Sequence, residues 1–108
     1  MKSTAAAKRQ RRDRAIVFKA LGHPARLAIV EALGGGERCV CELVEAAGLG
    51  WSAVSRHLSV LKAAGVLAYE KRGQQVYYRL ALPCVKLFTD CLDAARQGVA
   101  VEVRRCGR

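Results

Sequence analysis

The chain has 108 residues, which is the length of a single domain at roughly 100–200 residues per domain and leaves no room for a large cofactor enzyme. Hydrophobic residues make up 52% and charged residues 26%, as in a soluble globule rather than a disordered tail. No apolar run approaches the roughly 18 residues of a membrane span, and the N-terminus lacks the apolar core of a signal peptide. We therefore expect one cytoplasmic domain without enzymatic activity.

The net charge of +10 is distributed unevenly. In residues 1–14, six basic residues oppose Asp13, which gives +5, and the tail carries three arginines (Arg104, Arg105 and Arg108). Between these ends, the charge concentrates in residues 50–80, where five basic residues oppose Glu70 and give +4. A localised basic surface is the electrostatic signature of a protein that binds a polyanion.

Apolar spacing predicts four helices in succession. Residues 1–14 are small and basic and are expected to form a flexible N-terminal arm. The second helix should begin at Pro24, because proline suits a first helical position, and it should stop at the glycines of 34–36. The four helices are expected at 15–22, 24–33, about 40–47 and 51–64.

The rest of the chain predicts a hairpin and a last helix. The β-prone runs Val66–Lys71 and Gln75–Leu80 flank Arg72-Gly73-Gln74, and a helix should follow Pro83 to about Arg96. The order predicts a mainly α fold with a β-hairpin wing, a winged helix-turn-helix (α-α-α-α-β-β-α) over residues 15–96, followed by a basic tail at 97–108. The second helix of such a unit enters the DNA major groove. Since the +4 stretch coincides with this helix and hairpin, we predict a duplex-DNA binder.

The N-terminal residues of the 51–64 helix should make the base contacts. Arg56 is the best base reader, because its guanidinium can donate to guanine O6 and N7 together. Trp51 could instead pack between helices, and His57 is expected to make a structural hydrogen bond. The predicted DNA-binding residues are Trp51, Ser52, Ala53, Ser55 and Arg56 on the helix and Lys71, Arg72 and Gln74 on the wing. Basic residues 8–14 could add contacts from the arm.

Four segments resemble the ArsR/SmtB family of winged-helix repressors: Phe18-Lys-Ala-Leu-Gly-His-Pro-Ala-Arg26, Cys39-Val-Cys-Glu-Leu43, Val54-Ser-Arg-His-Leu58 and Gly73-Gln-Gln-Val-Tyr-Tyr-Arg-Leu80. The resemblance covers roughly residues 15–92. It implies a homodimer, formed through the first and last helices, that leaves a pseudo-palindromic operator when an effector binds. Within it, Cys39-Val-Cys41 and its neighbours resemble the arsenite-sensing motif of the arsenical-resistance repressors.

The cysteine chemistry agrees with this resemblance. Five cysteines without a secretory signal disfavour a disulfide scaffold. Cys39 and Cys41 lie at the start of the third helix, which favours thiolate, and soft thiolates suit trivalent arsenic or antimony. In a regular helix, side chains at i and i+2 point about 200° apart. One ion can therefore join them only if the first turn is absent or unwinds, and we predict that ligation distorts this helix and moves the reading helix off its groove.

The chain departs from the arsenite-sensing motif at its third cysteine, where Val44 stands. Either two thiolates suffice, which would suit methylarsenite, or a third comes from another part of the chain. The candidates are Cys106 in the tail and, less favoured, Cys84 and Cys91 on the last helix, whose shared face with Phe88 and Ala95 suits dimer packing. The family's zinc set of Asp, His and Glu on the last helix is not matched, because Asp90 and Asp93 have no histidine near them.

Three other readings remain open. The same DNA binder could sense oxidants or reactive sulfur, with Cys39 or Cys41 pairing to a distal cysteine. A small thiol oxidoreductase using Cys39-Val-Cys41 is a weaker alternative, because the sequence lacks a Cys-x-x-Cys motif and a thioredoxin-like βαβ pattern. A nonspecific nucleic-acid coater would bind random and operator duplexes equally.

Overall fold

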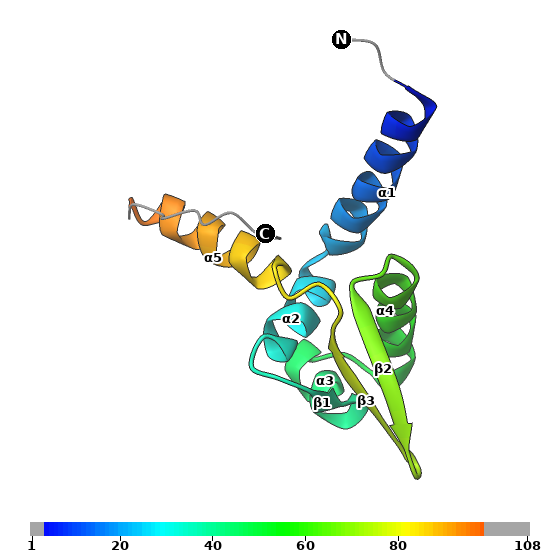
Figure 1. The fold of residues 1–108 in the computed structure, drawn as a ribbon. Coiled ribbons are helices and arrows are strands. Elements are labelled where there is room, and N and C mark those ends of the chain that lie inside the picture. Colours follow the sequence, from blue (N-terminus) through cyan, green and yellow to red (C-terminus); the bar gives the residue numbers. More distant parts are fainter. Residues whose placement is uncertain (1–3, 99–108) are drawn as a thin grey trace.

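The computed structural model describes residues 4–98 and confirms a winged helix-turn-helix (Figure 1). The three strands form one antiparallel sheet in the order β1-β3-β2, in which β2 and β3 make the hairpin wing. The elements are α1 (Ala5–Leu21), α2 (Pro24–Leu33), β1 (Arg38–Cys39), α3 (Val40–Ala47), α4 (Trp51–Ala63), β2 (Leu67–Arg72), β3 (Gln75–Leu80) and α5 (Val85–Arg96). Within residues 4–98, no helix is long and apolar enough to cross a membrane.

Local sequence signals explain where the helices begin and end. Thr4 caps α1, because its hydroxyl oxygen accepts a hydrogen bond from the Ala7 amide at 3.1 Å. His23 caps α2 in the same way through its ring Nδ1, which accepts from the Ala25 amide at 3.1 Å, and Pro24 follows as the first helical residue. Gly48 ends α3 in the left-handed conformation, with φ of 66°, which a residue with a Cβ adopts only under strain.

One apolar core joins the helices to the sheet. Leu43 of α3 and three residues of α4 lie in it beside α2, the start of β2 and the first residue of α5. The fully buried side chains are Ile29, Val30, Leu43, Val54, Leu61, Val66 and Val85. Helices α3 and α4 thus pack against each other in one core.

Two boundaries differ from the sequence prediction. The sequence predicts a flexible arm and starts the first helix at residue 15, whereas residues 5–14 form the first part of α1, which is one continuous helix from its Thr4 cap. Strand β1 was not predicted. It pairs with β3, so that Arg38 lies opposite Tyr78 and Cys39 lies opposite Tyr77. The start of α3 is therefore tied directly to the wing.

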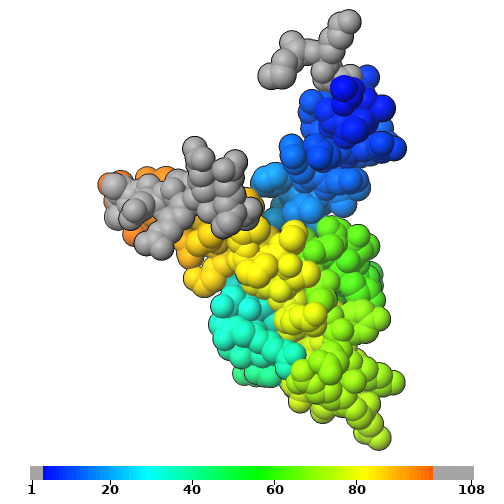
Figure 2. Space-filling model, viewed as in Figure 1, coloured from blue at the N-terminus to red at the C-terminus, as the bar shows by residue number. Residues whose placement is uncertain are grey.

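Helices α1 and α5 project from the body, and the wing protrudes at the opposite end of the molecule (Figures 1 and 2). Near their bases, Phe18 of α1 and Phe88 of α5 are in contact, with ring centroids 6.1 Å apart. Large apolar side chains nevertheless stay exposed along both helices, namely Ile16, Phe18, Leu87, Phe88 and Leu92. The chain thus carries an uncovered apolar surface on α1 and α5.

Candidate DNA interface and thiol site

The N-terminal half of α4 presents most of the predicted base-contacting residues to solvent. Ser52, Ser55 and Arg56 are exposed, and among residues 4–98 no carboxylate forms an ion pair with Arg56. Trp51 is 60% exposed, so it does not pack between helices as the alternative prediction held. Ala53, predicted to be exposed, is partly buried. The opposite face of α4 is buried through Val54, Leu58 and Leu61, which fixes the orientation of the exposed face.

A pair of histidines fixes α4 against the start of α2. Arg26 Nε donates a hydrogen bond to His57 Nδ1 at 3.3 Å, and the rings of His23 and His57 lie 4.5 Å apart. Arg26 also donates to the carbonyl oxygen of Ala20 at 3.0 Å, at the end of α1. Burial lowers the pKa of His57 below its ordinary value, and the charges of His23, Arg26 and Arg56 lower it further. The predicted structural hydrogen bond of His57 is thereby confirmed.

The wing exposes Lys71 and Gln74 at its tip, as the sequence predicts. The turn of the hairpin is formed by Gly73 and Gln74, and Gly73 has φ of 61°. Arg72, which the sequence predicts to contact DNA, is exposed on the wing, and two carboxylates bond its guanidinium. Its Nη2 lies 2.9 Å from Glu37 Oε2 and 2.9 Å from Glu70 Oε2.

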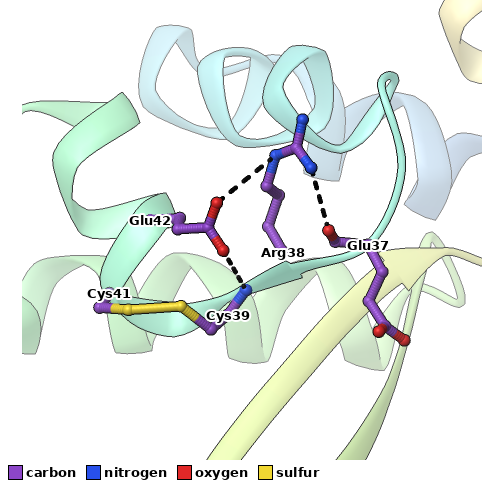
Figure 3. The surroundings of a disulfide bond; sticks show 5 residues. All are labelled: Glu37, Arg38, Cys39, Cys41 and Glu42. Atoms are coloured by element: carbon purple, nitrogen blue, oxygen red, sulfur yellow. Dashed lines mark hydrogen bonds and ion pairs between the residues drawn. A yellow bond between two sulfur atoms is a disulfide. The ribbon is translucent and has the colours of Figure 1, made fainter.

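Cys39 and Cys41 converge at the start of α3 (Figure 3). Cys39 is the cap residue, with extended backbone angles (φ −77°, ψ 162°), and Cys41 is the second residue of the helix. Their Cα atoms are 5.5 Å apart, and a disulfide joins their sulfurs. The 200° separation expected of two helical residues does not apply, because Cys39 belongs to strand β1. The first turn is absent at Cys39, so no unwinding of α3 is needed to bring the sulfurs together.

Charged neighbours hold this cap in place. Glu42 Oε1 accepts a hydrogen bond from the Cys39 amide at 3.2 Å, and Glu42 Oε2 lies 3.8 Å from Arg38 Nε. Figure 3 shows the Glu42 carboxylate above the Cys39 amide and Cys41 beside Cys39. Cys39 is 8% exposed, whereas Cys41 is exposed. Of the two cysteines, Cys41 is thus the more exposed residue.

The other candidate ligands lie elsewhere. Cys84 and Cys91 are free, partly buried thiols, one directly before α5 and one within it. Cys106 lies outside the described residues. Within residues 4–98, no group of three or more His, Cys, Asp or Glu side chains is arranged to hold a metal ion. The described part of one chain offers a two-sulfur site.

Two features of the site escaped the sequence analysis. Glu37 forms ion pairs that connect the loop before β1 with the wing, and a lone acid in a glycine-rich loop gives no sequence signal of its partner. Lys62 of α4 lies over the ring of Tyr69 in β2, 4.5 Å from its centroid, which joins the end of the reading helix to the wing. The closeness of α4 and β2 in sequence was the only available hint of this contact.

Comparisons with known proteins identify the family of the chain. Residues 23–69 match the family model described as "Bacterial regulatory protein, arsR family". The chain is 42% identical over 97 residues to the arsenical resistance operon repressor of Escherichia coli K12, which covers 85% of this chain and 83% of that protein. It is 49% identical over 65 residues to the transcriptional repressor SmtB of Mycobacterium tuberculosis H37Rv, over 60% of this chain, and spans about half (48%) of that relative's length.

A solved structure is similar across nearly the whole fold. It is the homodimeric winged helix-turn-helix DNA-binding domain of a possible ArsR-family transcriptional regulator from Mycobacterium bovis, with a TM-score of 0.83 and 26% identity. The match covers 93% of this chain and 96% of that one. By sequence and by fold, the chain belongs to the ArsR family of bacterial regulatory proteins.

Proposed function

We propose that this protein is a homodimeric transcriptional repressor that leaves its DNA operator when trivalent arsenic or antimony binds the thiolates of Cys39 and Cys41. The observation that carries the proposal is the convergence of these two sulfurs at the cap of α3, the helix that packs against the reading helix α4. The similarity to the arsenical resistance operon repressor of Escherichia coli supports the choice of inducer.

The donor set fits such an ion. Two soft sulfurs from residues two positions apart match a thiophilic semimetal better than a hard cation. The start of a helix favours the thiolate form that ligation needs. On binding, two arsenic–oxygen bonds of arsenite are replaced by two arsenic–sulfur bonds, and the thiol protons leave with the displaced oxygens as water. A species with two exchangeable positions, such as methylarsenite, needs no further protein ligand.

The DNA-binding half of the proposal rests on the exposed face of α4 and on the wing tip. Arg56 is exposed and carries no competing ion pair among the described residues, so its guanidinium is available to a guanine edge. Ser52 and Ser55 stand beside it, and Lys71 and Gln74 at the wing tip are placed for phosphate or minor-groove contacts. Two such units related by a two-fold axis read half-sites about 34–36 Å apart.

The apolar surface of α1 and α5 supplies the dimer contact in this proposal. Phe18 and Phe88 are 62% and 50% exposed, and Leu92 is 66% exposed, although all three are large and apolar. A contiguous exposed apolar surface marks an interaction site. A two-fold dimer buries the same surface of both copies, and the similar domain from Mycobacterium bovis is a homodimer.

The test measures DNA release from single Cys→Ser variants. A fluorescent duplex, selected by the protein from a random library, is titrated with each variant, and arsenite is then added to the reduced complex. Cys39→Ser and Cys41→Ser should bind the duplex as the unmodified protein does, but should not be released. Cys84→Ser and Cys91→Ser are the matched controls and should be released normally. Release of the Cys39→Ser or Cys41→Ser complex at the arsenite dose that releases the unmodified protein would place the site elsewhere.

A second function is favoured by one specific observation, the disulfide between Cys39 and Cys41. Here the same repressor responds to an oxidant, and the two thiols lose two electrons and two protons to a peroxide, which becomes water or an alcohol and water. The pairing is local rather than with a distal cysteine. Release of DNA by peroxide or polysulfide, with no release by arsenite under reducing conditions, would favour this alternative over the first.

A further inference from the structure

Arg72 of the wing is connected to the segment that carries Cys39 and Cys41 directly through Glu37 and indirectly through Tyr77 of β3. Both Nη atoms of Arg72 donate hydrogen bonds to the Glu37 carboxylate, with 2.9 Å from Nη2 to Oε2. The guanidinium also lies 4.8 Å from the ring centroid of Tyr77. Tyr77 is the residue of β3 that pairs with Cys39 of β1. Two routes, one ionic and one through the sheet, therefore lead from Arg72 to the backbone around Cys39.

The Glu37 side chain is oriented for this connection. In Figure 3 it points away from Arg38 and toward the strands of the wing, although Glu37 and Arg38 are adjacent in the chain. A two-pronged guanidinium–carboxylate pair fixes direction as well as distance, which a single contact does not. The Glu37 side chain is the more buried partner, at 31% exposed against 47% for Arg72. The ion pair thus sets the wing at a defined position relative to the cap of α3.

Glu70 provides an internal comparison. It also bonds Arg72 at 2.9 Å, but it lies on β2, within the same hairpin as Arg72. The Glu70 contact can hold the Arg72 side chain, but it cannot connect the hairpin to β1. Of the two carboxylates that bond Arg72, only Glu37 lies outside the hairpin, on the segment that carries Cys39.

We propose that the Glu37–Arg72 ion pair transmits the chemical state of Cys39 and Cys41 to the wing, with Arg72 acting as a positioning residue for the DNA-contacting tip. The inference rests on the proposed function, because it concerns how the same thiol pair regulates DNA binding. Closing a ring through both sulfurs constrains the backbone of residues 39–41, and Glu37 lies two residues upstream on the same segment. When this ring opens or closes, the backbone from Glu37 to Cys41 shifts. The ion pair then carries this shift into Arg72 and the adjoining turn at Gly73.

The test follows the wing directly, in full-length protein with Cys84, Cys91 and Cys106 changed to Ser, so that two thiols remain. The probe is phenylarsine oxide, which forms two arsenic–sulfur bonds with a dithiol and releases one water. Nitrogen-15 NMR records the Arg72 Nε–Hε and Gly73 amide resonances before and after the probe. Both should shift in this background and in Glu70→Gln, and both shifts should be much smaller in Glu37→Gln, where only the route through the sheet remains. Arg72→Lys keeps the charge but loses the two-pronged contact. Its Gly73 amide resonance should behave as it does in Glu37→Gln.

Wing resonances that do not move on dithiol capture, or that move equally in Glu37→Gln, would overturn the inference. A DNA measurement on the same samples separates it from the proposed function. The factor by which the probe weakens DNA binding, which in allosteric proteins is typically about 5–150-fold, should fall toward one in Glu37→Gln and should be unchanged in Glu70→Gln. In the variant that keeps only Cys39 and Cys41, the wing resonances could shift without any change in DNA affinity. That result would overturn the proposed inducer response but would support the coupling through Glu37 and Arg72.

Discussion

His57, on the reading helix, accepts a hydrogen bond from Arg26 of α2, with 3.3 Å between Nδ1 and Nε. An acceptor nitrogen must be unprotonated, so protonation of His57 at Nδ1 breaks this bond and places a second positive charge beside the guanidinium. The pKa of His57 is lowered first by burial and then by the charges of His23, Arg26 and Arg56. Protonation of His57 is therefore unfavourable in the folded protein.

This relationship predicts a pH-dependent stability. Because the folded pKa of His57 lies below the unfolded one, the unfolded state takes up the proton first as the pH falls. The stabilisation is fully present above the ordinary histidine pKa of about 6.5 and declines as the pH falls below it, until the folded pKa is reached. Urea denaturation between pH 5 and 8 measures this slope. His57→Gln should flatten the curve in that window, and an unchanged slope would show that other groups cause it.

Arg56→Ala should weaken specific DNA binding by roughly 1–3 kcal/mol and relax the base preference at its position. The reason is that Arg56 is exposed on the N-terminal half of α4, where a guanidinium reaches base edges. Fluorescence anisotropy on selected and random duplexes gives the ratio of affinities. Lys71→Ala, at the exposed wing tip, is the matched control and should lower both affinities similarly, because a phosphate contact carries no base preference. A constant ratio for Arg56→Ala would remove Arg56 from base reading.

Phe88→Asp should convert the dimer into a monomer. The side chain contacts Phe18 and is half exposed, so a carboxylate there would be buried without a partner when two copies associate. Sedimentation velocity reports the mass, and DNA affinity should fall by at least about tenfold, or 1.4 kcal/mol. Leu49→Asp, an exposed apolar position away from α1 and α5, should leave the mass unchanged. A dimeric Phe88→Asp protein would exclude this surface as the contact.

Gly48→Ala should destabilise the protein by about 1–2 kcal/mol, because the left-handed conformation at the end of α3 forces a Cβ toward a carbonyl oxygen. Open space surrounds the position, so the cost comes from the backbone alone. Gly35→Ala is the control, since its backbone is not left-handed and the nearest atom is the movable end of Arg38, at 3.2 Å. Thermal unfolding of both variants makes the comparison, and equal midpoints would contradict the argument.

The helices could be predicted from the sequence because their signals are local. Pro24, Gly48 and the apolar spacing of Val54, Leu58 and Leu61 each act within one or two turns, and the structure places α2, α3 and α4 within a residue or so of the predicted bounds. The start of α1 was missed because a basic, alanine-containing stretch has no apolar face. The hydroxyl of Thr4 nevertheless caps it, and alanine and arginine are strong helix formers.

The site was predicted in composition but not in geometry. Cys39 and Cys41 were identified from spacing, yet their convergence depends on β1, a two-residue strand that is too short to leave a periodic signal. The ion pair between Glu37 and Arg72 spans 35 residues of sequence, so no local rule could reveal it. The charge of residues 50–80 is correct as a sum, but it does not distinguish Arg56, which is free of ion pairs in the described part of the chain, from Arg72, which two carboxylates occupy.

Placing both sulfurs on a single turn of one chain has a kinetic consequence. Ring closure between Cys39 and Cys41 is unimolecular, so its rate and midpoint should not depend on protein concentration or on whether a second subunit is bound. Each protomer of the dimer then carries its own complete thiol site. The dose needed for half-maximal response is therefore set by the chemistry of one protomer. An arrangement with one cysteine from each subunit would instead make the midpoint vary with dilution.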